Sequence, residues 1–155
     1  MAKMLKVLIV YYSQTGNTEK MARAVEEGAK SVVGINVEVK YFARPEELAE
    51  ADAIILGMPT YYHDMGIDMK NLLEAVSKEE IDLKGKVGAA FGSYGWSGEA
   101  PIMLVEIMKH KFGMDVIEPP IRIKYNPDGE GLDECRKLGK TVAEKIVKSA
   151  LDSSG

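Results

Sequence analysis

Short apolar runs alternate with helix-like repeats along the whole chain, and this alternation is the feature that most restricts the fold. The runs predicted to be strands are residues 6–12, 37–41, 53–58, 87–91 and 116–125. The first, third and fourth are almost continuously apolar, which is typical of strands buried on both faces. The second alternates apolar and charged side chains, and Pro119-Pro120 interrupts the last, so we expect both of these strands at the edges of a sheet.

Helical spacing of apolar residues fills the segments between these runs. The predicted helices are residues 21–32, a short helix that begins at Pro45, and residues 69–76, 102–112 and 132–146. We expect Gly34 to be the C-cap of the first helix. Pro101 is expected to begin the helix 102–112, and Gly113 to end it. Strands that alternate with helices in this way predict βαβ units and a parallel sheet covered on both faces.

The fold class is therefore α/β, a three-layer α-β-α sandwich with a five-stranded parallel sheet. The two edge strands are second and fifth in the chain, which fits the strand order 2-1-3-4-5. The order 3-2-1-4-5 would put the buried run 53–58 at an edge. No linker or internal repeat divides the chain, so we expect one domain over residues 1–152 and a frayed tail at 153–155.

Composition excludes several classes of protein. The net charge of −4 without a basic stripe argues against a nucleic-acid partner, and no apolar run approaches the roughly 20 residues that span a bilayer. The single cysteine, Cys135, excludes an internal disulfide and is expected to be a buried helix residue. The two histidines, His63 and His110, are too few for a metal site. We expect a cytoplasmic protein without metal, nucleic acid or membrane partner.

The stretch SQTGNT, which directly follows the first strand, is the strongest candidate for a binding loop. Its residues are Ser13, Gln14, Thr15, Gly16, Asn17 and Thr18. A helix N-terminus that presents free amides and a partial positive charge suits a phosphate, and the hydroxyls and amides of this loop add neutral hydrogen-bonding groups. The stretch matches neither GxxxxGK[ST] nor GxGxxG, which disfavours nucleoside triphosphates and dinucleotides. The alternative is that a threonine or asparagine here only caps the helix.

Two further loops follow the third and fourth strands, whose carboxyl ends lie on the same rim of the predicted sheet as SQTGNT. They are PTYYHDM, residues 59–65, and GSYGWSGEA, residues 92–100. Their aromatic residues are Tyr61, Tyr62, Tyr94 and Trp96. Aromatic rings on a rim suit a flat ligand held by stacking, so the three loops together favour a planar ring attached to a monophosphate, and flavin mononucleotide (FMN) fits.

The sequence resembles the flavodoxin family of the short type over essentially its whole length, which implies a flavodoxin-like fold. SQTGNT resembles that family's phosphate loop, [ST]-x-T-G-x-[ST]. FGSYGWSGEA resembles the third FMN loop in the flavodoxin-like domain of flavodiiron proteins (A-type flavoproteins), the group that the chain most resembles. Those proteins carry a di-iron domain ahead of this one, so the chain looks like a free-standing version or an excised domain. The middle loop also resembles that of tryptophan-repressor-binding-type quinone oxidoreductases.

The resemblance implies a set of FMN-binding residues and no catalytic side chain or metal ligand. Ser13, Gln14, Thr15, Gly16, Asn17 and Thr18 would hold the phosphate. Pro59, Thr60, Tyr61, Tyr62 and His63 would pass along one side of the isoalloxazine ring. Ser93, Tyr94, Gly95, Trp96 and Gly98 would meet its other side, with Trp96 or Tyr94 as a stacking face.

The implied function is electron transfer through FMN between redox partner proteins, such as a reductase and a ferredoxin-type or di-iron-type protein, by a monomer or weak dimer. The protein would then be a carrier rather than an enzyme with its own substrate chemistry. One alternative is an FMN-dependent NAD(P)H:quinone oxidoreductase, and another is a phosphate-binding domain without flavin.

Overall fold

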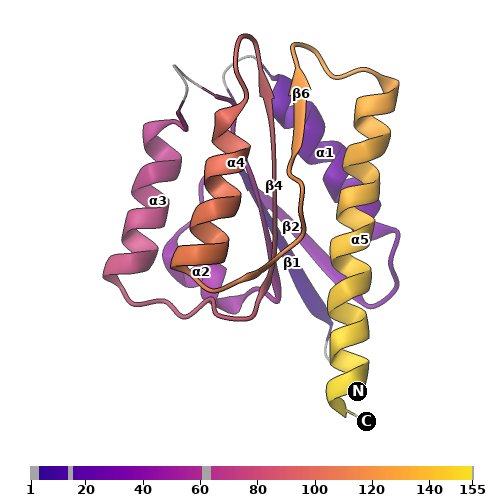
Figure 1. The fold of residues 1–155 in the computed structure, drawn as a ribbon. Helices are drawn as coiled ribbons and strands as arrows, with labels where there is room; N and C mark the ends of the chain where they lie inside the picture. Colours follow the sequence, from indigo (N-terminus) through magenta and orange to yellow (C-terminus); the bar gives the residue numbers. More distant parts are fainter. Residues whose placement is uncertain (1–3, 14–15, 61–63, 155) are drawn as a thin grey trace.

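A parallel sheet forms the middle layer of the molecule (Figure 1). In this computed structural model, which describes residues 4–13, 16–60 and 64–154, the strands are β1 (Leu5–Tyr11), β2 (Ile35–Lys40), β3 (Ala53–Gly57), β4 (Val87–Tyr94), β5 (Asp115–Val116) and β6 (Ile121–Lys124). Their order is β2-β1-β3-β4-β5, and β6 also pairs with β4. The predicted order is confirmed.

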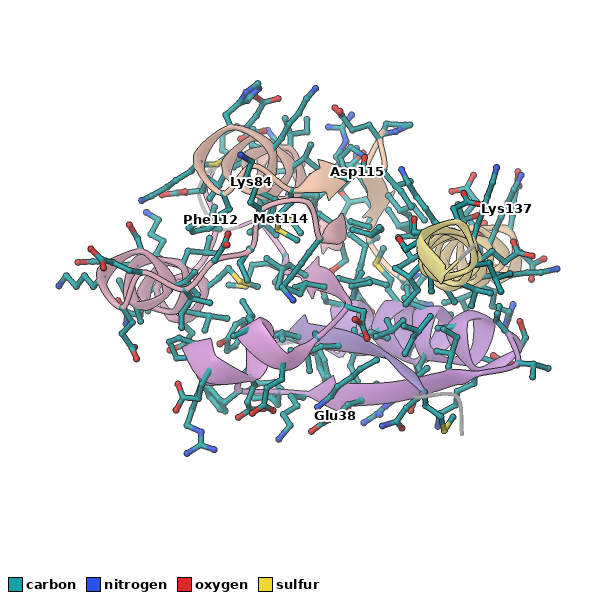
Figure 2. The ribbon with its side chains drawn as sticks, turned by 90° about the horizontal axis from the view of Figure 1, so that it is seen from below. Glu38, Lys84, Phe112, Met114, Asp115 and Lys137 are labelled. Atoms are coloured by element: carbon teal, nitrogen blue, oxygen red, sulfur yellow. The ribbon has the colours of Figure 1, made fainter. Side chains whose placement is uncertain are left out.

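The last predicted strand is divided into two short pieces at the edge of the sheet. β5 pairs with β4 at Val87↔Asp115, and β6 pairs with β4 at Phe91↔Ile121. Pro119 and Pro120 lie between the two pieces and have no N–H group for a ladder. The interruption and the edge position are therefore as predicted. In Figure 2, Glu38 marks the β2 edge of the sheet and Asp115 the β5 edge.

Helices cover both faces of the sheet, which confirms the three-layer α/β fold. They are α1 (Asn17–Lys30), α2 (Pro45–Glu50), α3 (Ile67–Lys78), α4 (Glu99–Glu106), which continues as the π-helical turn η1 (Ile107–Lys111), and α5 (Gly129–Ser154). The helices α1 and α5 pack on one face, and α2, α3 and α4 lie on the other (Figure 1). Seen from below, Met114 lies on the side of α3 and α4, and Lys137 projects from α5 on the other side (Figure 2).

Several predicted boundaries were wrong. α1 ends at Lys30, and Gly34 (φ 87°) lies just before β2, where its carbonyl accepts the Leu5 N–H, rather than at the helix end. α4 begins at Glu99, before Pro101, because a proline is tolerated throughout the first turn. α5 continues to Ser154, into the segment expected as a tail, since no glycine or proline precedes Gly155 there. β4 extends to Tyr94, because β6 supplies a pairing partner beyond Phe91.

Neighbouring residues of the strands point into two separate cores. Leu8 and Ile54 face the side of α2, α3 and α4, whereas Ile9 and Ile55 face α1 and α5. We call the first the methionine-rich side, because its buried residues include Met58, Met65, Met69, Met108 and Met114. The second, the α1–α5 side, contains Met21, Val25, Cys135 and Val142 among its buried residues.

Two glycines allow α1 and α5 to approach closely. A Cβ atom on Gly28 would lie 1.8 Å from the carbonyl oxygen of Arg136, and one on Gly139 would lie 2.0 Å from the carbonyl oxygen of Val25. Both obstacles are backbone atoms, so the two helices are in contact along their main chains.

The start of β1 and the end of α5 lie side by side. Leu5 and Ser153 line the same small hollow, and Figure 1 shows both ends of the chain at the amino-terminal edge of the sheet, opposite the loops that follow β1, β3 and β4. Within residues 4–13, 16–60 and 64–154, no helix combines the length and the apolar character that a membrane crossing requires.

Candidate functional site

The first loop leads directly from β1 into α1. Gly16 is the N-cap of α1, with φ of 90°, and its N–H donates to Ser13 Oγ at 3.0 Å. Glycine has no side chain, so the N-cap itself supplies no hydroxyl or amide to the N–H groups of the first helical turn. Neither Asn17 nor Thr18 is therefore the N-cap, and the N–H groups of the first turn are positioned to bind an anion. Gln14 and Thr15 lie outside the described residues.

A buried pair of hydroxyls joins the first loop to the end of β4. Thr18 Oγ1 lies 2.9 Å from Ser93 Oγ, and the Ser93 N–H donates to Thr18 Oγ1 at 3.4 Å. Both residues are buried. The Thr18 side chain therefore fixes α1 against β4, and its backbone N–H lies in the first turn of α1.

The middle loop is fixed to the third loop by Thr60. Its N–H donates to the Ser93 carbonyl oxygen at 3.3 Å, and its Oγ1 accepts the Ala100 N–H of α4 at 3.0 Å. Pro59 precedes it on the rim, whereas Tyr61, Tyr62 and His63 lie outside the described residues. At the far end of this loop the Lys70 ammonium pairs with Asp64 and holds the pKa of that carboxyl below its usual value.

The third loop begins later than predicted, because Ser93 and Tyr94 are the last residues of β4. The Tyr94 ring packs over Gly98, where an added Cβ atom would lie 3.0 Å from Tyr94 Cδ1. Beyond it, Trp96 is 79% exposed. Tyr94 is thus fixed in the wall of the site, whereas most of the surface of Trp96 is accessible to solvent or to a ligand.

A cavity of about 230 Å³ lies where these loops meet. It is lined by Asn17, Pro59, Thr60, Ser93, Tyr94, Gly95 and Tyr125. Six of these seven residues were predicted as site residues, and they come from all three predicted loops. Tyr125 was missed, because the alternating pattern assigned it to the last strand. The turn sequence NPDG that directly follows it is the signal that marks the end of that strand and a fourth loop on the rim.

Tyrosines lie close behind the first loop. Tyr41 Oη donates to the Ser13 carbonyl oxygen at 3.0 Å, and the Tyr41 ring meets those of Tyr11 and Tyr12 edge-on, with centroids 5.4 and 5.8 Å apart. Burial raises the pKa of Tyr12 to about 12, with smaller contributions from Asp68 and Tyr41. Tyr12 is therefore neutral at physiological pH.

The chemistry of the described loops fits a phosphate joined to an aromatic ring system. The lining of the cavity combines Asn17 at the start of α1, the neutral side chains of Thr60 and Ser93, and the aromatic residues Tyr94 and Tyr125. Over residues 4–13, 16–60 and 64–154, no cluster of three or more His, Cys, Asp or Glu residues could hold a metal ion. The arrangement can bind and shield an FMN-like group.

Comparison with known proteins identifies the class to which this site belongs. The flavodoxin family model matches residues 9–139. A flavodoxin of Aquifex aeolicus is 34% identical over 163 residues, covering 92% of this chain and 87% of the relative. The solved structure of a flavodoxin from the domain Archaea is 41% identical, with a TM-score of 0.84 over 92% of this chain and 99% of that one.

A type A flavoprotein of Rhodobacter capsulatus is also similar, at 36% identity over 152 residues. The match covers 93% of this chain but 34% of that relative, so the chain spans about a third of the length of such proteins. Flavodoxins and the FMN domains of flavodiiron proteins bind FMN, and the chemistry of the described loops fits that cofactor. The chain belongs to the flavodoxin family.

Proposed function

We propose that this protein holds FMN at the carboxyl ends of β1, β3 and β4 and carries electrons between separate redox proteins, a reductase on one side and a ferredoxin-type or di-iron-type protein on the other. The observation that carries the proposal is the cavity that joins the start of α1 to Tyr94 and Gly95. Bound FMN supplies the redox chemistry, and the protein orients and shields it.

The side chains around the cavity support binding rather than catalysis. Asn17, Thr60 and Ser93 offer neutral amide and hydroxyl groups, and Tyr94 offers an aromatic face. Asp64, the acidic residue of the middle loop, is held in its charged form by Lys70. A site of this kind needs a partner protein to deliver and remove electrons.

The absence of positively charged side chains from the first loop would influence the reduction potential of the bound flavin. SQTGNT contains no lysine or arginine, so the charge of a bound phosphate is met by helix N–H groups and hydroxyls. The negative charge then remains close to the flavin and opposes its reduction to an anion, which lowers the reduction potential. Gln14 and Thr15 take part in this proposal on the strength of the resemblance alone, as do Tyr61, Tyr62 and His63 in the middle loop.

The first experiment is a visible spectrum of the protein after addition of excess FMN and desalting. We expect retained flavin absorbance that NADH or NADPH alone does not bleach, and that NADPH bleaches once a flavoprotein reductase is added. Rapid bleaching by the nucleotide alone would instead select an NAD(P)H:quinone oxidoreductase. Loss of the flavin on desalting would exclude both functions and leave a phosphate-binding domain.

A matched pair of glycine variants tests the first loop. Gly16 and Gly34 have nearly the same left-handed conformation, with φ of 90° and 87°, and nothing lies within 4 Å of a Cβ atom added to either. Gly16→Ala and Gly34→Ala should therefore lose similar stability, about 1 kcal/mol. Only Gly16→Ala should weaken FMN binding, because its backbone lies at the phosphate end. Equal FMN affinity in the two variants would contradict the assignment.

A further inference from the structure

A fourth loop reaches the rim of the sheet between β6 and α5. It begins at Tyr125, which lines the same cavity as Asn17, Thr60 and Tyr94. Tyr125 thus lines the cavity although it lies outside all three predicted binding loops. The Tyr125 ring lies beside Gly95 of the third loop, where an added Cβ atom would be 3.7 Å from Tyr125 Cε1.

The backbone of Tyr125 is held in a conformation that few residues other than glycine adopt. Its φ is 61°, and its N–H donates to the Tyr94 carbonyl oxygen at 2.7 Å. This hydrogen bond continues the pairing of β6 with β4 while the left-handed conformation turns the chain out of the strand. Such residues persist only where the surroundings fix them, and they are frequent at ligand clamps.

The fourth loop is also fixed to α1 and α5. Lys20, on the second turn of α1, donates from Nζ to Asn126 Oδ1 at 2.9 Å. Asp128 Oδ1 accepts the Gly131 N–H at 2.8 Å at the start of α5. Tyr125 is therefore placed by contacts on both sides of it in the sequence, and its position does not depend on a bound ligand.

The Tyr125 ring nevertheless has a large unused surface. The residue is 62% exposed although it lines a cavity, and the Lys124 ammonium lies 5.3 Å from its ring centroid. An aromatic side chain on a fixed backbone beside a cavity provides contact area at a reduced entropic cost.

We propose that Tyr125 is a further cofactor-contacting residue, which covers the ribityl phosphate chain of FMN between the first loop and the third. This inference rests on the proposed function. The cavity runs from Asn17 at the start of α1 to Gly95 beyond β4, which is the span between the phosphate end and the ring end of the site. The ring shields this chain from water and slows the release of FMN.

The test compares FMN affinity and dissociation rate in the wild type, Tyr125→Asn, Tyr125→Phe and Leu151→Asn, using the quenching of flavin fluorescence. Asparagine tolerates the left-handed conformation, so Tyr125→Asn removes the ring without displacing the loop. Leu151 is the control, because it is also largely exposed, at 66%, and lies near the end of α5, away from the residues that line the cavity. Circular dichroism and thermal melts verify that each variant is folded.

We expect Tyr125→Asn to raise the Kd for FMN about tenfold, mainly through faster dissociation, as loss of a partly buried aromatic contact implies. Tyr125→Phe and Leu151→Asn should stay within about twofold of the wild type. The visible absorption bands of bound FMN should not move in Tyr125→Asn, because the ring system of the flavin is held elsewhere.

Three results would overturn the inference. Wild-type affinity in Tyr125→Asn would show that the ring makes no contact with FMN, while the proposed function would stand as long as the wild type retains FMN. A shift of the visible bands in that variant would place Tyr125 against the flavin ring instead of the ribityl chain. Failure of the wild type to retain FMN would overturn the proposed function and this inference together.

Discussion

On one side of the sheet, α1 and α5 touch through their backbones at Gly28 and Gly139, whereas on the other side methionine side chains fill the space between the strands and α3 and α4. Backbone contacts cannot rearrange without moving a whole helix. Methionine is unbranched and flexible, so a core rich in it adapts to small changes in shape.

The two sides also carry different parts of the site. α1 begins at the first loop and is fixed by α5, so the first loop is attached to the more rigid side. α4 follows the third loop and packs on the methionine-rich side, together with α3, which follows the middle loop. The comparison indicates a firmly held first loop and more adaptable middle and third loops.

The largest effect is expected for Gly139→Ala on the α1–α5 side. The new Cβ atom would lie 2.0 Å from the Val25 carbonyl oxygen, so α1 and α5 must move apart, and we expect a loss of about 3 kcal/mol in the free energy of unfolding. Urea denaturation measures it. Gly129→Ala, at the start of the same helix with nothing within 4 Å, is the control and should be nearly neutral. Similar stability of the two variants would show that the helices are not in close contact.

Alanine substitutions at two glycines in the strands allow a direct comparison of the two sides. A Cβ atom on Gly57 would lie 2.2 Å from the buried Phe91 ring on the α1–α5 side, whereas one on Gly88 would meet the terminal methyl group of Met108 at 2.6 Å on the methionine-rich side. We expect Gly57→Ala to lose about 2 kcal/mol and Gly88→Ala less than about 1 kcal/mol, because a methionine end can move aside. Thermal unfolding monitored by circular dichroism distinguishes them, and the reverse order would contradict the proposed difference between the sides.

A smaller effect concerns the pH dependence of the free energy of unfolding, to which a different buried residue contributes on each side. Burial raises the pKa of Cys135, on the α1–α5 side, from 9.0 to about 12. The unfolded chain therefore releases this proton first, so the stabilisation is complete below pH 9 and is lost progressively up to about pH 12. At pH 10 the loss should be about 1 kcal/mol, and Cys135→Ala should lack it.

Tyr12, on the methionine-rich side, affects stability at higher pH than Cys135 does. Burial raises the pKa of Tyr12 from 10.0 to about 12, so its contribution is complete below pH 10 and falls above that value. The difference between the wild type and Cys135→Ala in denaturation curves at pH 8, 9 and 10 isolates Cys135, because the tyrosine contributions are common to both proteins. If Cys135→Ala and the wild type lost stability in parallel over this range, the thiol would have to be accessible to solvent.

The smallest effect concerns ion pairs on the outer surfaces of the helices. On α1, Glu26 pairs with Lys30 at 2.9 Å and with Arg23 at 3.4 Å, and its side chain is 19% exposed. Burial opposes the charged form of this carboxyl, but the two cations outweigh it and lower its pKa. Glu26→Gln should lose about 0.5 kcal/mol near neutral pH and nothing in acid, where the carboxyl is protonated in both states.

Glu74 on α3 provides the matched comparison on the methionine-rich side. Among the described residues it pairs only with Lys78, and its side chain is 62% exposed. Glu74→Gln should therefore cost less than Glu26→Gln when both are measured by urea denaturation at low salt. An equal cost would mean that the additional partner and the burial of Glu26 contribute nothing.

The order of the strands could be predicted because it depends on local patterns. The buried character of residues 53–58 and the charged alternation of residues 37–41 are visible in short windows, and they define which strands are central and which lie at an edge. The first loop could be predicted for the same reason, since the strand, the polar loop and the helix are consecutive. Its neighbours on the rim then followed from the order of the strands.

The features that could not be predicted depend on contacts between distant residues. β4 extends to Tyr94 because β6, some 30 residues later, pairs with it, and Tyr125 leaves that strand because its N–H bonds to Tyr94. The close approach of α1 and α5 joins Gly28 to Arg136. No local window contains both members of these pairs, so the sequence pattern alone places Tyr125 in a strand and gives Gly28 only an apolar helix position.

The position of the chain ends determines how this fold can be combined with other proteins. Leu5 and Ser153 lie together at the amino-terminal edge of the sheet, and the cavity with its four loops lies at the opposite edge. A polypeptide fused to either end therefore starts on the far side of the molecule and leaves the edge with the cavity open to approaching proteins. An affinity tag or surface anchor attached at either end would likewise orient that edge outward, so the protein can be immobilised without covering the cavity.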